Sequence, residues 1–69
     1  MRLEFYEWNC GERDKPPAPI DELTMSRAVQ VLKTLSAALA EQSSCRARLI
    51  DGDGDRVEFH ITPRRVIAT

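Results

Sequence analysis

Three aspartates at alternate positions form the stretch of this chain that most resembles a ligand site. The segment "LIDGDGDRVEFHI" places Asp51, Asp53 and Asp55 as a calcium-binding loop places its carboxylates. An EF-hand loop starting at Asp51 needs glycine at its sixth position and glutamate at its twelfth. The sequence has Arg56 and Thr62 there, and the following "RVEFHI" alternates like a strand rather than a helix. We therefore interpret the stretch as a turn and expect no metal site and no cofactor.

A β-hairpin accounts for the same stretch through its side-chain pattern. A three-residue loop, Gly52-Asp53-Gly54, pairs apolar residues on one face: Leu49 with Val57, Ala47 with Phe59, and Cys45 with Ile61. The other face then pairs Arg48 with Glu58, Ile50 with Arg56, and Arg46 with His60. Such consistent faces fix the register of a hairpin. Gly54 also falls where a three-residue loop needs a left-handed residue.

The remaining reactive side chains give no catalytic pattern. His60 is the single histidine and is predicted on a solvent-facing side of its strand. Cys10 and Cys45 are not in a C-x-x-C pair, so both are expected as reduced thiols. No nucleophile–base pair, phosphate-binding glycine loop or metal cluster is visible, so no catalytic residue is assigned and an enzyme is not expected. An active site built across a dimer interface stays open as an alternative.

The composition is that of one small domain, residues 1–69. The chain is 42% apolar and 30% charged with a net charge of −1, which is typical of a folded globular chain. Neither half is strongly basic, so nothing global favours nucleic acid or anionic lipid. No apolar run approaches the ~18 residues of a membrane span, and the charged start is not a signal peptide. We expect a cytoplasmic protein without a membrane partner.

The first twenty residues predict a strand and a stiff connection. Arg2–Asn9 is short and aromatic-rich, which is typical of a strand. Cys10–Ile20 contains three prolines and predicts an extended loop within the domain. The same segment matches R-x-x-P-x-x-P, the form of proline-rich ligands, with Arg13, Pro16 and Pro19. That motif arises often by chance, so the connection is the preferred interpretation.

Residues 21–42 predict an amphipathic helix. Apolar side chains recur there at three- and four-residue spacing: Met25, Ala28, Val31, Leu32, Leu35, Ala38 and Leu39. Asp21 or Thr24 can cap its first turn by accepting a backbone N–H. Ser43 and Ser44 end the periodicity.

The order of these elements predicts an α+β fold. One helix, about 21–42, would pack on a three-stranded sheet in a two-layer sandwich of order β-α-β-β with a C-terminal antiparallel hairpin. The first strand is expected to pair antiparallel with the third, giving the order 1-3-2. The alternative is 3-2-1 with a right-handed parallel crossover. Residues 64–69 are either a frayed tail or a short edge strand after Pro63.

The sheet face opposite the helix is the predicted interaction surface. Six interface candidates are expected on it: Tyr6, Trp8, Arg46, Arg48, Ile50 and Arg56. Tryptophan, tyrosine and arginine are enriched at protein interfaces. We therefore predict a small non-enzymatic interaction or accessory module that acts through protein–protein association, as a homodimer or as a subunit.

Two other interpretations of that face remain open. Aromatic residues among arginines can bind single-stranded nucleic acid by stacking bases and contacting phosphates. Glu4, Glu7 and Glu58 share or border the face, which weakens that alternative. The face can also be simply solvated, or a β-bulge can turn Trp8 back toward the core.

Overall fold

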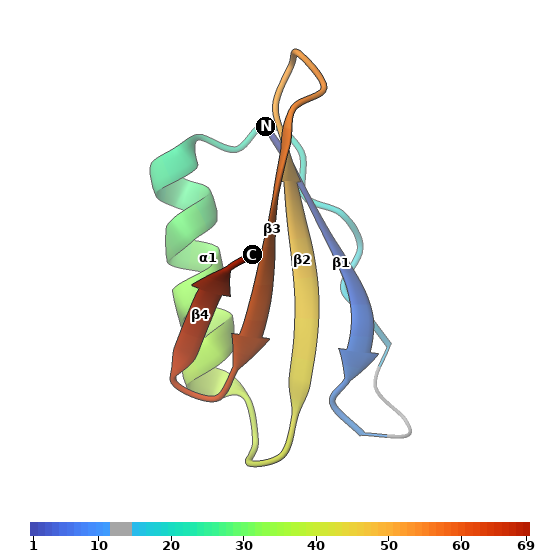
Figure 1. The fold of residues 1–69 in the computed structure, drawn as a ribbon, viewed down its shortest axis with the longest axis vertical. Coiled ribbons are helices and arrows are strands. Elements are labelled where there is room, and N and C mark those ends of the chain that lie inside the picture. Colours follow the sequence, from blue (N-terminus) through green and yellow to red (C-terminus); the bar gives the residue numbers. More distant parts are fainter. Residues whose placement is uncertain (12–14) are drawn as a thin grey trace.

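The computed structural model describes residues 1–11 and 15–69, which form an α+β fold of one helix on a four-stranded antiparallel sheet (Figure 1). Arg13 of the proline-rich motif lies outside the described residues. The elements in chain order are β1 (Arg2–Asn9), α1 (Met25–Ala38), β2 (Ser44–Ile50), β3 (Arg56–Thr62) and β4 (Arg65–Ala68). The α+β class and the two-layer arrangement are confirmed.

The predicted three-stranded sheet is wrong, because residues 65–68 form a fourth strand. β4 pairs antiparallel with β3, from Phe59 opposite Ala68 to Thr62 opposite Arg65. The two-residue turn between them uses Pro63 and Arg64, and Arg64 takes a φ of 64°. Proline at the first turn position and a positive φ at the second are the features of a type II turn. Pro63 therefore ends β3 and also starts the return of the chain.

The predicted strand order 1-3-2 is also wrong, since the sheet has the order β1-β2-β3-β4. The alternative order, 3-2-1, gives each strand its observed neighbours. It required β1 and β2 to be parallel, however, and they are antiparallel. The cause is the connector (residues 15–23), which runs back along β1 before α1 begins (Figure 1). Leu3 and Ile20 exchange backbone hydrogen bonds of 2.9 and 3.0 Å. This extra reversal puts α1 parallel to β1, and β2 then returns antiparallel.

Prolines limit how far the connector pairs with β1. Beyond Ile20, the backbone N–H of Leu23 donates to the Met1 carbonyl at 2.9 Å. On the other side of Ile20, positions 16, 17 and 19 are prolines, which have no N–H to donate to a ladder. The connector consequently touches the edge of β1 at one end and diverges from it at the other.

The β2–β3 hairpin has the predicted register at every pair from Cys45 opposite Ile61 to Ile50 opposite Arg56. Asp51 N–H donates to the Asp55 carbonyl at 2.9 Å and closes the loop. The Asp51 carboxylate accepts the backbone N–H groups of Asp53, at 2.8 Å, and Asp55, at 3.1 Å. Gly54 has a φ of 86°. The turn interpretation is confirmed, and the first aspartate serves the turn itself.

The helix is shorter than predicted. Thr24 is the N-cap and accepts the Arg27 N–H at 3.1 Å through its hydroxyl, so the Thr24 alternative is the right one. Asp21 cannot start the helix, because Leu23 is bonded to Met1 and Glu22 takes a φ of 60°. At the other end Leu39 is extended, with φ −68° and ψ 136°, yet it still packs on the core.

Ser36 joins the end of α1 to the β3–β4 turn. It is the buried polar side chain of the described core, at 3% exposure. Its hydroxyl donates to the Thr62 carbonyl at 2.6 Å and also lies within hydrogen-bonding distance of the Arg65 carbonyl, at 3.2 Å. Its carbonyl accepts the Arg64 N–H at 3.2 Å. These bonds satisfy partly buried polar groups of α1 and of the β3–β4 turn, and leaving such groups without a partner costs stability.

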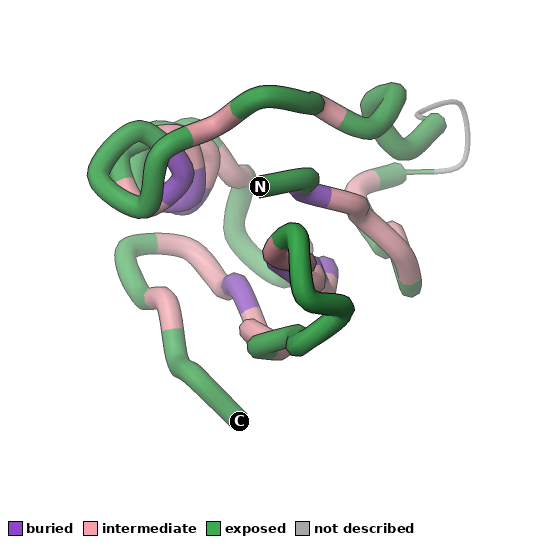
Figure 2. Tube along the Cα trace, turned by 90° about the horizontal axis from the view of Figure 1, so that it is seen from above, coloured by how far each residue is buried: buried purple, intermediate pink, exposed green. Residues whose placement is uncertain are grey.

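That attachment places α1 over one half of the sheet. α1 contacts β4 and β3, while the connector lies in the same layer over the β1 side (Figure 2). The buried core joins both layers: Leu3, Ala28, Leu32, Cys45, Ala47, Leu49 and Ile61. Val57 shares the inner face with these residues, opposite Leu49, but it remains 43% exposed.

We predict that Ser36→Ala lowers the free energy of unfolding by about 1–3 kcal/mol, because the Thr62 and Arg65 carbonyls lose their buried donor. Urea denaturation measures the change. Ser26→Ala on the exposed side of the same helix is the control, with an expected change within about 0.5 kcal/mol. Equal stabilities of the two variants would contradict the assigned role of Ser36.

The two loop glycines offer a second test. A Cβ at Gly52 or Gly54 meets no atom within 4 Å, and only Gly54 has a positive φ. Gly54→Ala should therefore cost about 1–2 kcal/mol of backbone strain. Gly52→Ala should be neutral or slightly stabilising, by about 0.4–1 kcal/mol, because alanine restricts the unfolded chain. Thermal unfolding of the pair measures the difference, and equal midpoints would refute this loop conformation.

Candidate functional site

The predicted interaction surface is the outer face, which we define as the sheet face opposite α1. Five of the six interface candidates lie on it: Tyr6, Arg46, Arg48, Ile50 and Arg56. Strand alternation puts the β2 members there, because their chain neighbours Cys45, Ala47 and Leu49 are buried under the second layer. The sequence therefore located this set correctly, but its sixth member is elsewhere.

Trp8 is not on the outer face, so its place among the interface candidates is wrong, and the alternative in which a β-bulge turns it toward the core is the right one. The β1–β2 register shifts between Tyr6 and Asn9, so Glu7 and Trp8 together oppose a single residue. Glu7 takes a φ of 47° at this bulge. An extra residue reverses the alternation that follows it, so Trp8 turns inward and packs on the core. Its ring meets Phe5 edge-on, with centroids 6.2 Å apart.

The central arginines of the outer face lie close to carboxylates. Arg46 Nε is 2.8 Å from the Glu7 carboxylate. Arg48 lies 3.9 Å from Glu4 and 3.6 Å from Glu58, and its guanidinium carbon is 4.4 Å above the Tyr6 ring. The strand register produces this arrangement, because it pairs Glu4 and Glu58 with Arg48 across neighbouring strands. The positive charge at the centre of this face is thus largely balanced.

The periphery of the outer face carries separated polar and apolar groups. Arg56 is exposed opposite Ile50, and His60 lies between Arg46 and Ile67. Ile67 is 38% exposed. Ile50 and Ile67 lie on β2 and β4, with β3 between them, so they form no continuous apolar patch.

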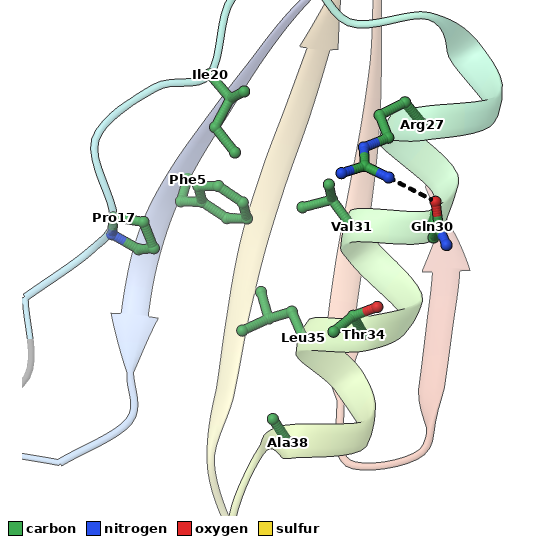
Figure 3. A pocket seen from close by; sticks show the side chains of 9 residues that line it. All are labelled: Phe5, Pro17, Ile20, Arg27, Gln30, Val31, Thr34, Leu35 and Ala38. Carbon is green, nitrogen blue, oxygen red and sulfur yellow. Dashed lines mark hydrogen bonds between the residues drawn. The ribbon is translucent and has the colours of Figure 1, made fainter.

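A contiguous apolar surface lies instead on the other side of the sheet, between α1 and the connector (Figure 3). We call it the groove, and its volume is about 550 Å³. Its lining comprises Phe5, Pro17, Ile20, Arg27, Gln30, Val31, Thr34, Leu35 and Ala38. Phe5 from β1 lies between the two walls of the groove (Figure 3). One wall is formed by Pro17 and Ile20, and the other by α1.

The groove exists because the second layer is incomplete. α1 is attached to β3 and β4, and the prolines keep the connector extended rather than helical. Phe5, Val31 and Leu35 are therefore only half-buried, although all three pack against the core. An open surface of this kind is a common feature of binding sites.

Arg27 is the charged side chain of the groove lining. Its Nη1 donates to the Gln30 side-chain oxygen at 3.1 Å, and Figure 3 shows both at the upper end of the α1 wall. Within residues 1–11 and 15–69, no carboxylate lies within ion-pair distance of it. The groove thus combines an apolar floor with an unneutralised cation at one end.

Sequence reasoning did not identify the groove. Arg27, Gln30 and Thr34 lie outside the apolar stripe that the sequence predicts for residues 21–42, and all three are exposed. One signal was present: Arg27 stands in the first turn of a helix, where acidic residues are favoured. Its significance depends on the position of α1, which the sequence alone does not reveal.

The described residues do not bring together groups suited to metal binding, since no set of three or more histidine, cysteine or acidic side chains is clustered among them. Cys45 is buried at 1% exposure, and this burial, with a smaller contribution from nearby Cys10, raises the pKa of its thiol to about 11. A nucleophilic cysteine needs the opposite shift.

The raised pKa of Cys45 predicts a loss of stability at alkaline pH. The unfolded thiol ionises near its ordinary value of 9.0, whereas the folded thiol stays neutral to about 11. Unfolding is therefore favoured progressively between those values. Urea denaturation from pH 8 to 11, with reductant present, measures this slope, and Cys45→Ala should reduce it. An unchanged slope in the variant would contradict the buried position of the thiol.

No family model, no curated protein and no solved structure matches this chain. Within the described part of the chain, no helix has the length and apolar character needed to cross a membrane.

Proposed function

We propose that this protein is a small non-enzymatic binding module, and that the groove is where it binds a segment of another polypeptide. The observation that carries the proposal is the contiguous apolar lining of the groove, which remains accessible beside a formed core. Burial of apolar surface drives most protein association. The partner segment is therefore apolar on one side. It comes from a different protein, with which this chain associates as a subunit or accessory.

The charge pattern of the molecule supports a protein partner over a nucleic acid. Binding to a phosphate backbone depends on basic side chains that are available to replace counterions. Arg46 and Arg48 already lie 2.8–3.9 Å from glutamates. The outer face is accordingly proposed as a solvated face, and the groove as the site of association.

The chemistry of Cys45 supports the non-enzymatic part of the proposal. A thiol with a pKa of about 11 is protonated at neutral pH and has little nucleophilic reactivity. Cys45 is a buried thiol, a state that the reducing cytoplasm maintains. We propose a cytoplasmic location on that basis.

Site-specific photo-cross-linking in cells that express the protein tests the proposal. A photoreactive amino acid at Thr34, an exposed position on the α1 wall, should form a covalent adduct with one polypeptide. The same amino acid at Ser26, exposed on the same helix but not lining the groove, is the control and should give no such adduct. Mass spectrometry then identifies the partner and the segment attached.

Purified proteins complete the test. Thr34→Arg puts a long charged side chain at the groove and should weaken binding of the identified partner by at least about tenfold, because apolar contact is replaced by a buried charge. Ser26→Arg should leave the affinity unchanged. Equal cross-linking at the two positions, or an affinity that Thr34→Arg does not alter, would overturn the groove as the binding site. An adduct of two copies of this chain would overturn the heterologous partner.

A further inference from the structure

We infer that the groove accepts an amphipathic helix, whose apolar stripe packs along α1 and whose acidic side chain pairs with Arg27. This inference rests on the proposed function and names the chemistry of the partner. Three features carry it: the space left in the second layer, the position of Arg27 in α1, and the absence of a carboxylate within ion-pair distance of Arg27 among residues 1–11 and 15–69.

The space between α1 and the connector, above Phe5, suits one more helix. Four paired strands at about 4.8 Å spacing occupy roughly 19 Å across the sheet, whereas a helix with its side chains is about 10 Å wide. One helix therefore covers about half of this sheet, and α1 covers the β3–β4 half. The connector covers only the outer margin of the other half (Figures 1 and 2). A helix beside α1 would bury Phe5, Val31 and Leu35 together.

The α1 wall has the spacing that helix packing requires. Arg27, Val31, Leu35 and Ala38 follow one another at intervals of four, four and three residues, along about 16 Å of the helix. Such a row forms a straight ridge against which the side chains of a second helix pack. Ala38, at the end far from Arg27 (Figure 3), is small enough for close approach.

Arg27 contradicts the local rules of its own helix. It is the third residue after the Thr24 cap, where a glutamate would complete a capping box and favour the positive end of the helix dipole. The first turn of α1 instead contains no acidic residue. A residue that breaks a local preference without a structural gain is a candidate for a functional role.

The environment of Arg27 identifies the complementary group. Among the described residues, a carboxylate lies within 4 Å of Arg2, Arg46, Arg48 and Arg64, but of neither Arg27, Arg56 nor Arg65. Arg27 has instead the neutral side-chain oxygen of Gln30, at 3.1 Å. A carboxylate at the edge of an apolar contact would gain a charge-assisted, bidentate hydrogen bond from its guanidinium.

A second copy of this chain does not supply such a helix. The exposed large apolar side chains among the described residues are Met1, Met25, Val57 and Ile67. They come from four different elements or segments, so they form no helical stripe. In the apolar stripe of α1, Ala28 and Leu32 are buried and Val31, Leu35 and Leu39 are partly buried against the core, so α1 offers no fully exposed apolar stripe to a second copy. The occupant is therefore a helix from a different protein.

A displayed library of 18-residue peptides tests the inference with the full chain as bait. The library fixes a helix-forming alanine background and randomises the other positions among apolar, acidic, basic and proline residues. On the wild-type chain we expect enrichment of apolar residues at i, i+3 or i+4, and i+7, with an acidic residue at one fixed distance from them. On Arg27→Glu, the residue at that distance should become basic.

The charge-reversed bait is expected to fold, because Arg27→Glu creates the favourable T-x-x-E arrangement after Thr24. Lys33→Glu is the matched control: it makes the same charge change on an exposed residue of the same helix, beside Arg64 and Arg65 rather than in the groove. It should enrich the same peptides as the wild type. For the best peptide, exchange of its acidic residue for lysine should weaken binding about tenfold, the range of a close interfacial charge pair.

The outcomes separate this inference from the proposed function. Helical binders without a charge preference, or with one that Arg27→Glu does not reverse, would overturn the role of Arg27. Enrichment of proline-containing peptides, or of none, would overturn the helical occupant. In either case a specific adduct at Thr34 in the cross-linking experiment would leave the groove as a binding site, whereas failure of both experiments would remove both proposals.

Discussion

The hydrogen bonds of Ser36 decide which half of the sheet α1 covers. Its hydroxyl and carbonyl bind the turn between β3 and β4, so the end of the helix cannot slide toward β1. A single helix that is held over β3 and β4, with the connector at the β1 edge, leaves the groove above Phe5 open. The half-buried state of Phe5, Val31 and Leu35 follows from that constraint.

The connector supplies the second condition for the groove. It runs back along β1, bonds to it at Leu3, and so reverses the direction in which the helix sets out. Its prolines keep it extended, so it forms a wall rather than a second helix. The same segment thus explains two features that differ from a simple β-α-β unit: the antiparallel β1–β2 pair and the open space beside α1.

The centre of the outer face and the groove differ in whether their arginines lie beside carboxylates. On the outer face, cross-strand register brings Arg46 and Arg48 to glutamates, so the charges are paired within the fold. At the groove, Arg27 faces apolar side chains and a neutral amide. Paired surface charges contribute little to stability, whereas a cation that has no described carboxylate beside it can give a charge-assisted hydrogen bond to an acidic partner. In the function we propose, the groove is for that reason the more specific of the two surfaces.

The sequence by itself determined the features that depend on short-range patterns. Alternation of apolar residues fixed the β2–β3 register, Gly54 fixed its loop, and Thr24 was identified as a possible cap. The sheet order, the inward turn of Trp8 and the groove required the tertiary structure. Each depends on contacts between distant segments, namely Ile20 with Leu3, the Glu7 bulge with β2, and Ser36 with the Thr62 carbonyl. One extra residue at a bulge reverses a face, and one hydrogen-bonded serine positions a helix, so periodicity alone cannot determine either outcome.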